Sequence, residues 1–310
     1  MGTPDFAVPS LRMLLREEYE VVGVFCQPDR PKGRGHQLTA CPVKKEAVMA
    51  GIPVFQPTKI RSEEGLAMLK GLSPDLCVTA AFGQILSKDV LAVPPLGTIN
   101  VHASLLPKHR GSAPIHRAII MGDAETGVTT MMTDEGIDTG DMLLHARTRI
   151  GASDTAGTLT DKLAELGAEL LMETLAALRN GTLLRKPQDE ARASYEPKLT
   201  KETGKIDWNA DGSTIDCLVR GTDPWPGAFT MLNGSAVKVF GVRLLDEKSA
   251  EPCGTVVRAD TKEGLIVRCR DRLLEITELQ MPGQKRMSAK AYLAGHKIET
   301  GTILGDKENA

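Results

Sequence analysis

The sequence lacks the long apolar stretches and the one-sided charge that mark several classes of protein. It has no run of 18 apolar residues, so no membrane-spanning helix is expected. Its first residues contain neither the basic nor the apolar region of a secretory signal peptide. The formal net charge is only −2, so the whole chain gives no sign of a nucleic-acid partner, and any such surface must be local. We therefore expect a cytoplasmic protein with no membrane partner.

Metal and nucleotide motifs are missing as well. The six cysteines form no C-x-x-C pair, and we expect free thiols in a reducing compartment. No two histidines lie four residues apart beside a glutamate, which disfavours a zinc hydrolase, and no metal site is expected. No G-x-x-x-x-G-K-[ST] occurs, and no G-x-G-x-x-G follows the first recognisable strand. A P-loop nucleotidase and an NAD-dependent dehydrogenase are therefore both disfavoured.

What the sequence does contain is a regular alternation of strand-like and helix-like segments. Of its 310 residues, 41% are hydrophobic, which is enough for ordinary cores. Short β-branched runs alternate with amphipathic stretches, which predicts a mostly parallel sheet covered by helices on both faces. A longer amphipathic helix is predicted over 158–179. The expected strands are 20–26, 52–55, 75–81, 97–103, 128–133 and 142–149, and the other expected helices are 8–16, 42–50 and 63–70.

The composition changes after the long helix. Residues 185–205 are polar, charged and interrupted by two prolines, which predicts a linker between domains. From 206 onward, short alternating runs are separated by turns such as Asn233-Gly234, a pattern typical of a small antiparallel barrel. We therefore expect an α/β domain over 1–184, the linker, and a small β-domain over 206–310.

Polar residues at the end of the strand expected over 97–103 are the strongest candidates for chemistry. Asn100 and His102 flank Val101, so their side chains share one face of the strand. Ligands of open α/β sheets bind at the carboxyl ends of strands, where an amide and an imidazole can stabilise an oxyanion. The alternative reading is that the histidine is a structural, hydrogen-bonded residue. The loop expected between the strands 128–133 and 142–149 offers three carboxylates that could orient the imidazole, unless it is only a turn, and spacing does not decide between them: Asp134, Asp138 and Asp141.

A second candidate is a basic loop after the first expected strand. No acidic residue occurs between positions 30 and 45, and prolines and glycines favour a protruding loop over a helix. Such a loop near the strand ends could contact phosphates, although a solvated loop without a partner fits the same pattern. Its cationic residues are Arg30, Lys32, Arg34, Lys44 and Lys45.

Several motifs, in their order along the chain, resemble the bacterial methionyl-tRNA formyltransferase family. The resemblance covers nearly the whole chain, and the number of motifs makes it specific. In the first half it rests on 2–7, 29–35, 100–107 with 110–111, and 138–141. In the second half it rests on 195–200, 205–208, 224–228 and 283–295.

This resemblance implies a Rossmann-like formyltransferase domain followed by an OB-like barrel. It implies transfer of a formyl group from 10-formyltetrahydrofolate to the amino group of initiator Met-tRNA, giving N-formylmethionyl-tRNA for translation initiation. No metal is implied, and a monomer is expected. The implied catalytic residues are Asn100, His102 and Asp138, so the resemblance selects one of the three aspartates. The implied folate contacts are Phe82, Gly83, Gln84, Ile85, Leu86, Ser104, Leu105, Leu106 and Pro107. The implied tRNA contacts are Arg30, Lys32, Arg34, Lys44, Lys45, Lys285 and Arg286.

The sequence departs from the family pattern at its beginning. In the family a β-strand precedes the motif at 2–7, whereas here Met1 stands directly before it. We expect Met1 to be the last residue of that strand. The strand would be central in the sheet, and each of its buried apolar side chains would contribute roughly 1.5–3 kcal/mol.

Two other functions fit part of the pattern. One is formyl transfer to a different amine, such as glycinamide ribonucleotide or an amino-sugar nucleotide. The other is tRNA binding by an inactive relative. The basic loop and the motif at 224–228 argue against the first, and the intact residues Asn100, His102 and Asp138 argue against the second.

Overall fold

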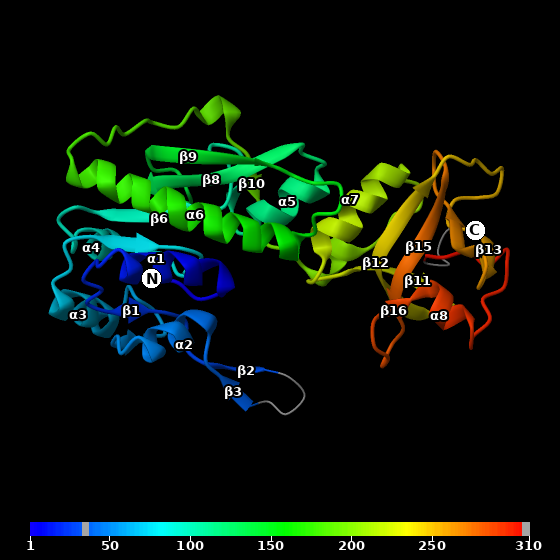
Figure 1. Ribbon diagram of the computed structural model, residues 1–310, viewed down its shortest axis with the longest axis horizontal. Coiled ribbons are helices and arrows are strands. Elements are labelled where there is room, and N and C mark those ends of the chain that lie inside the picture. Colours follow the sequence, from blue (N-terminus) through cyan, green and yellow to red (C-terminus); the bar gives the residue numbers. More distant parts are fainter. Residues whose placement is uncertain (33–36, 306–310) are drawn as a thin grey trace. The chain divides into compact units, whose positions relative to one another are not determined.

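The computed structural model describes residues 1–32 and 37–305, and the chain forms two compact units (Figure 1). Each unit is assembled from more than one stretch of chain. Within the described residues, no helix is long and apolar enough to cross a membrane. Unit 1 contains Met1–Pro114, Glu125–Arg149 and Leu159–Glu196, and unit 2 contains Ile115–Ala124, Ile150–Thr158 and Pro197–Ala310.

The main sheet of unit 1 consists of β5 (Cys77–Thr79), β6 (Thr98–His102), β8 (Glu125–Met132) and β9 (Met142–Arg149), in that order. β5 and β6 pair in parallel, whereas β8 runs antiparallel to β6 and β9 antiparallel to β8. Each of these strands overlaps one expected from the sequence. The parallel pair brings the carboxyl ends of β5 and β6 to one edge, which is where the polar residues of β6 lie.

A second pair of parallel strands belongs to the same unit. It joins β1 (Val24–Phe25) to β4 (Val54–Phe55), and the rings of the two phenylalanines stack with centroids 5.0 Å apart. β1 is shorter than the strand expected over 20–26 because β4 pairs with only two of its residues. Phe25 lies in a core shared with residues of α3 (Glu63–Leu72) and α4 (Lys88–Leu91).

The long helix α6 (Ala156–Arg179) confirms the helix expected over 158–179 and lies along β6 and β8. Gly167 permits the close approach. A Cβ atom built there would lie 2.9 Å from Val101 Cγ1 and 3.4 Å from Val128 Cγ1. Since Val101 faces α6, the side chains of its neighbours on β6 point to the opposite face.

The remaining elements of unit 1 are short. α1 has the bounds expected from the sequence, and it packs beside α2. The full set of these remaining elements is η1 (Asp5–Ala7), α1 (Val8–Arg16), β2 (Arg30–Lys32), β3 (Gln37–Thr39), α2 (Pro42–Met49), β7 (Arg110–Gly111), η2 (Glu190–Arg192) and β10 (Tyr195–Glu196).

The first two residues lie between β1 and β5. The Gly2 N–H donates to Phe25 O at 2.9 Å, and Met1 O accepts from the Ala80 N–H at 3.0 Å. The Met1 amine donates to Val78 O at 2.7 Å, and burial lowers its pKa. Met1 and Gly2 therefore occupy a strand position. A cavity of about 840 Å³ lies beside them, lined by residues of α1, β1, β5 and α6.

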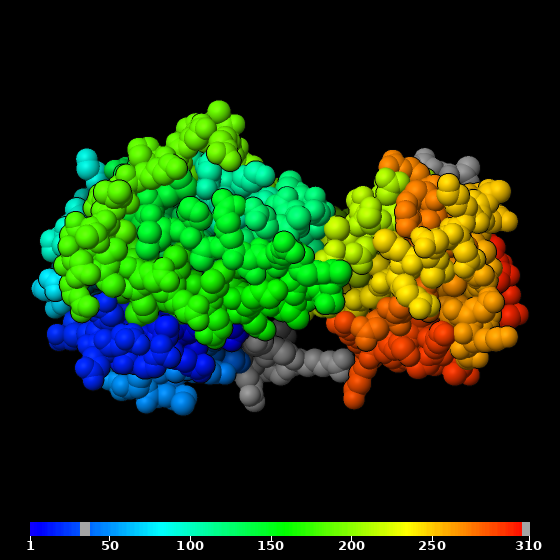
Figure 2. All heavy atoms as spheres, turned by 45° about the horizontal axis from the view of Figure 1, so that its top comes forward, coloured from blue at the N-terminus to red at the C-terminus, as the bar shows by residue number. Residues whose placement is uncertain are grey.

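After α6 the chain returns over the surface of unit 1, where Figure 2 shows it in yellow-green. Lys186 forms an antiparallel bridge with Met142 at the start of β9. Tyr195–Glu196 then pairs in parallel with Arg110–Gly111, so that β10 lies beside β7. Part of the stretch expected to be a linker therefore contacts the loop that follows β6.

Most of unit 2 comes from the second half of the chain, where an antiparallel sheet and the helices α7 and α8 surround a separate core. Its elements from Lys201 onward are η3 (Lys201–Gly204), α7 (Gly212–Thr222), β11 (Ala228–Leu232), β12 (Ser235–Leu245), β13 (Val256–Asp260), β14 (Gly264–Arg268), β15 (Leu273–Gln280), β16 (Met287–Ser288) and α8 (Ala289–Leu293). The strand order is β11–β12–β15–β14–β13, with β16 beside β15. In the core, the buried Trp208 donates its indole N–H to Thr230 Oγ1 at 2.9 Å. The antiparallel sheet fits the small β-domain expected from the sequence.

Helix α5 (Pro114–Ile120) comes from the first half of the sequence but packs against α7 of unit 2. The contact depends on Gly221. A Cβ atom there would lie 2.5 Å from Ile120 Cγ1 and 3.1 Å from His116 O. The two helices are therefore closer than any side chain at this position would allow.

Candidate active site

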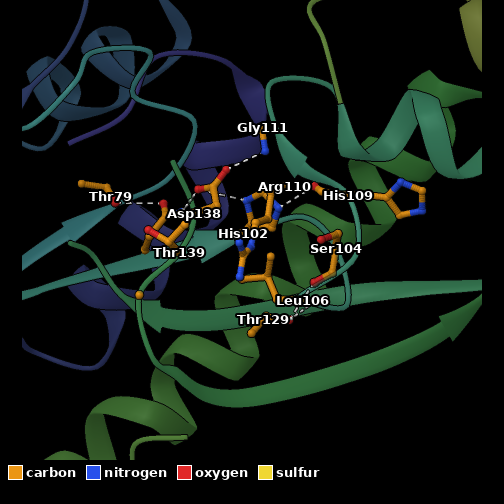
Figure 3. Close-up of polar contacts among 12 residues, drawn as sticks. Thr79, His102, Ser104, Leu106, His109, Arg110, Gly111, Thr129, Asp138 and Thr139 are labelled. Carbon is orange, nitrogen blue, oxygen red and sulfur yellow. Dashed lines mark hydrogen bonds and ion pairs between the residues drawn. The ribbon is translucent and has the colours of Figure 1, made fainter. Parts of the chain in front are cut away.

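The end of β6 carries the polar pair expected from the sequence. Asn100 is half-buried and His102 is buried, and both project from the face opposite Val101. This confirms the alternation expected along the strand. The His102 side chain points toward Asp138 in the loop between β8 and β9 (Figure 3), and the Asn100 amide also contacts Asp138.

Of the three aspartates, Asp138 faces this pair. Its Oδ1 lies 3.5 Å from Asn100 Nδ2 and 3.5 Å from His102 Nδ1, distances at the long end of the hydrogen-bond range. Its Oδ2 accepts from the Gly111 N–H at 2.8 Å. Asp134 instead accepts from the hydroxyl of Thr139 at 2.8 Å. Asp138 is thus the carboxylate that lies against the imidazole, which the spacing in the sequence could not determine.

The amide of Asn100 is oriented by a neighbour on the adjacent strand. The Thr79 hydroxyl donates to Asn100 Oδ1 at 2.9 Å, which leaves the amide N–H₂ group to face Asp138. Thr79 and Asn100 are register partners in the parallel pair β5–β6. Thr79 was not among the residues predicted from the sequence. Once the strand register is known, a hydroxyl residue directly opposite Asn100 on the neighbouring strand can be predicted to contact it.

The imidazole of His102 has an oxygen acceptor at each nitrogen. Nε2 lies 3.0 Å from the backbone O of His109, and Nδ1 faces Asp138. Contacts at both nitrogens therefore fix the orientation of the ring. The contacts of Asp138 with His102 Nδ1 and with the Asn100 amide are both long, so an N–H at each of these positions could turn to a negatively charged oxygen of a substrate.

The backbone conformation after His102 is held by internal hydrogen bonds. Ser104 is completely buried, and its hydroxyl donates to Lys108 O at 2.6 Å. Thr129 Oγ1 accepts from the Leu106 N–H at 3.1 Å and donates to Ser104 O at 2.7 Å. The expected folate contacts Ser104–Pro107, with Leu105 half-buried and a cis bond before Pro107, therefore form an ordered loop beside the polar cluster.

The other expected folate contacts, residues 82–86, follow β5 and divide into two groups. Phe82 and Leu86 are buried in the core around Phe25. Gln84 is tied to backbone, because it accepts from the Ile60 N–H and donates to a carbonyl of the same loop. Gly83 and Ile85 are exposed, and Ile85 leaves 63% of its surface accessible. Ile85 is thus an apolar side chain available to a ligand.

The basic loop contains the hairpin β2–β3, on which Arg30 and Lys32 lie. Arg34 lies outside the described residues. Lys45 is exposed, whereas the Lys44 ammonium donates to Asp29 at 2.6 Å and to a glutamine. The hydrogen bond from Lys44 lowers the pKa of Asp29. Of this set, Lys44 is therefore already engaged in an ion pair.

The two expected tRNA contacts of unit 2 also differ. Lys285 is exposed. Arg286 lies over the ring of Phe240 at 4.4 Å and bonds to Asp223 at 3.0 Å and to Glu278. Burial alone would lower the pKa of Arg286, but these carboxylates raise it. An RNA phosphate would have to compete with two carboxylates for this guanidinium.

Comparison with known proteins places these features in a family. A sequence model described as formyl transferase matches residues 1–175, and one described as formyl transferase, C-terminal domain, matches residues 198–297. A methionyl-tRNA formyltransferase of Ruminiclostridium cellulolyticum is 54% identical over 307 residues, which cover 98% of each chain. One from Geotalea daltonii is 51% identical over 310 residues, covering 100% of this chain and 98% of the relative. The chain belongs to the methionyl-tRNA formyltransferase family.

A solved structure shares the fold of this formyltransferase family member. An N-formyltransferase from Helicobacter canadensis, in complex with folinic acid and dTDP-3-aminofucose, superimposes with a TM-score of 0.65. The match covers 88% of this chain and 96% of that one at 20% identity, so it supports the fold alone. Family membership and the converging side chains together make the end of β6 the candidate active site.

Proposed function

We propose that the protein transfers the formyl group of 10-formyltetrahydrofolate to the amino group of methionyl-tRNA, giving N-formylmethionyl-tRNA. The observation that carries the mechanism is the convergence of Asn100, His102 and Asp138, with Asp138 Oδ1 3.5 Å from a nitrogen of each partner. Because the acceptor is an aminoacyl-tRNA that initiates translation, the proposed reaction takes place in the cytoplasm.

In the proposed reaction the amine of the methionyl ester attacks the formyl carbon of the folate. A C–N bond forms, and the carbonyl oxygen becomes an oxyanion that accepts hydrogen bonds from Asn100 and His102. Asp138 orients His102 and takes part, through water, in removing the proton from the attacking amine. The bond between the formyl carbon and N10 of the folate then breaks, and N10 receives a proton as tetrahydrofolate leaves.

The described residues offer binding groups for both proposed substrates. The folate is proposed to bind against the ordered loop Ser104–Pro107 and the exposed side chain of Ile85. The acceptor end of the tRNA is proposed to contact the basic hairpin that carries Arg30 and Lys32. Exposed lysines such as Lys285 would add phosphate contacts in unit 2.

The test is a formylation assay with purified protein, 10-formyltetrahydrofolate and initiator Met-tRNA. Asn100→Ala and His102→Ala should each lower the rate by about 100- to 1000-fold, the usual cost of losing one oxyanion donor. The exposed Asp189 side chain bonds to the Ala191 N–H, so Asp189→Asn serves as a control and should leave the rate unchanged. Far-UV circular dichroism would establish that every variant is folded.

Competing acceptors make the assay specific. Free methionine, glycinamide ribonucleotide and an amino-sugar nucleotide are offered in parallel with Met-tRNA. Formylation of one of these small amines instead of Met-tRNA would reject the proposed acceptor. Binding of Met-tRNA without product would identify an inactive relative, and wild-type rates in either alanine variant would reject the mechanism.

A further inference from the structure

Two loops bring Asp138 and the acceptor of His102 into place, and both contain a residue in the left-handed backbone region. His109 has φ 57° and Asp138 has φ 55°. Such conformations are unfavourable for residues other than glycine, and they persist where surrounding contacts enforce them. Among the described residues, the stretch 188–196 supplies several of those contacts.

The first contact is made by Gln188 on the Asp138 loop. Its amide group donates to Asp138 O and to Gly140 O, both at 2.8 Å. Its Oε1 accepts from Arg110 Nε at 3.0 Å. The Arg110 side chain is completely buried and is further held by Glu190 at 2.7 Å. Gln188 therefore connects the backbone of Asp138 to a rigid residue of the loop after β6.

The second contact is made by Ser194 and Glu196 on the loop after β6. Ser194 Oγ accepts from the His109 N–H at 2.8 Å and donates to Glu196 at 3.2 Å. The buried Glu196 also bonds to His109 Nδ1 at 2.9 Å. The carbonyl of His109 is the acceptor for His102 Nε2, so both bonds help to determine where that carbonyl points.

We infer that Gln188 and Ser194 are positioning residues, which hold Asp138 and the His109 carbonyl against His102 from a stretch of chain outside the proposed folate and tRNA contacts. The inference rests on the proposed function only for its kinetic consequence. Gln188 acts on the Nδ1 side of the imidazole, through Asp138. Ser194 acts on the Nε2 side, through His109. Together they determine the orientation of the ring.

The test uses one small substitution on each side. Gln188→Glu keeps the shape and the acceptor for Arg110 but removes the two N–H donors that hold the Asp138 loop. Ser194→Ala removes one hydroxyl. Asp189→Asn is the matched control, because Asp189 is exposed in the same stretch and its capping bond to Ala191 N–H also suits an asparagine.

Two readouts separate positioning from a merely structural role. At saturating substrate, Gln188→Glu should lower kcat by about 10- to 100-fold, since misplacement of a reacting group by about 1 Å costs this much. The KM for Met-tRNA and for the folate should change less than about threefold, and the thermal unfolding midpoint should stay close to that of the wild type. Ser194→Ala should lower kcat in the same way but less. In histidine-labelled protein, the ¹⁵N signals of His102 should shift in both variants and not in Asp189→Asn.

The outcomes are distinguishable. Wild-type kcat together with unchanged His102 signals in both variants would overturn the inference. Shifted His102 signals in a protein whose wild type forms no formylated product would support the positioning and reject the proposed function. A lower kcat accompanied by a clearly lower thermal unfolding midpoint in both variants would assign these residues a structural role and overturn the inference.

Discussion

Replacing Asp138 by asparagine removes one charge from the site and almost nothing else. The asparagine keeps an oxygen that can accept from the Gly111 N–H, so the loop should retain its conformation. What it loses is a negative charge 3.5 Å from His102 Nδ1. If the amide nitrogen takes the place of Oδ1, it also sets a donor against the donors of Asn100 and His102.

The size of the effect follows from this distance. An imidazolium at His102 would interact with the Asp138 carboxylate 3.5 Å away by about 5 kcal/mol at an effective dielectric constant of about 20. The Asp138 side chain is 18% exposed, and solvent screening reduces the value to about 3 kcal/mol. Since about 1.4 kcal/mol corresponds to a tenfold change in rate, kcat should fall by roughly 100-fold.

Asp134→Asn is the control for this experiment. It makes the same chemical change in the same loop, but Asp134 is exposed and faces Thr139. Its kcat in the formylation assay should stay within about twofold of the wild type. The reasoning would be refuted if Asp138→Asn kept more than a tenth of the wild-type kcat, or if Asp134→Asn lost as much activity.

Three further predictions concern stability and reactivity. Burial alone would raise the pKa of Asp271, but hydrogen bonds, chiefly from the Gly212 N–H at the start of α7, lower it to about 2. A carboxyl group with a depressed pKa stabilises the folded state at pH values above its unfolded pKa, near 3.9. Asp271→Asn should therefore lower the free energy of unfolding by about 1–2 kcal/mol at pH 7, and by progressively less as the pH falls from 4 toward 2. Urea unfolding measures this difference. Gly221→Ala should destabilise the protein by about 1–3 kcal/mol through overpacking, whereas Gly71→Ala in α3, where a Cβ meets nothing within 4 Å, should stabilise it by about 0.5–1 kcal/mol. Burial raises the pKa of Cys26 to about 12, so this thiol should not react with iodoacetamide at pH 8 in the folded protein, as mass spectrometry of labelled peptides would reveal.

Each of these three predictions can be contradicted by a specific measurement. A stability difference between wild type and Asp271→Asn that is the same at pH 7 and pH 3 would show that the Asp271 carboxylate does not stabilise the fold. A shift of the urea midpoint in the same direction by Gly71→Ala and Gly221→Ala would contradict the difference in packing between the two positions. Labelling of Cys26 at the rate of an exposed thiol would contradict the burial of that residue.

The sequence predicted those parts of the fold that depend on local patterns. Helix α1 has the expected bounds, and α6 begins two residues before the expected 158–179, because a long amphipathic stripe identifies a helix without knowledge of its neighbours. The strand expected over 20–26 was too long, since apolar character alone does not reveal how many residues have a pairing partner. Here β4 pairs with only Val24 and Phe25.

The candidate site was predictable in part for the same reason. Alternation along a strand placed Asn100 and His102 on one face. The choice of Asp138 depends on a left-handed residue and on a bond from the Gly111 N–H, 27 positions away, and no local pattern contains that information. The contacts of Gln188 and Ser194 were missed because they come from short segments with no periodicity, pairing with residues more than 40 positions away.

The division of the chain into interleaved units has a consequence for its synthesis. Helix α5 belongs with α7, yet the ribosome makes α7 about 100 residues later, which at 5–20 residues per second is a delay of roughly 5–20 seconds. During this time apolar residues of α5 such as Ile120, whose side chain lies against Gly221 of α7 in the finished protein, have no partner helix to cover them. The nascent chain should therefore present a binding site for a chaperone that disappears once α7 has emerged.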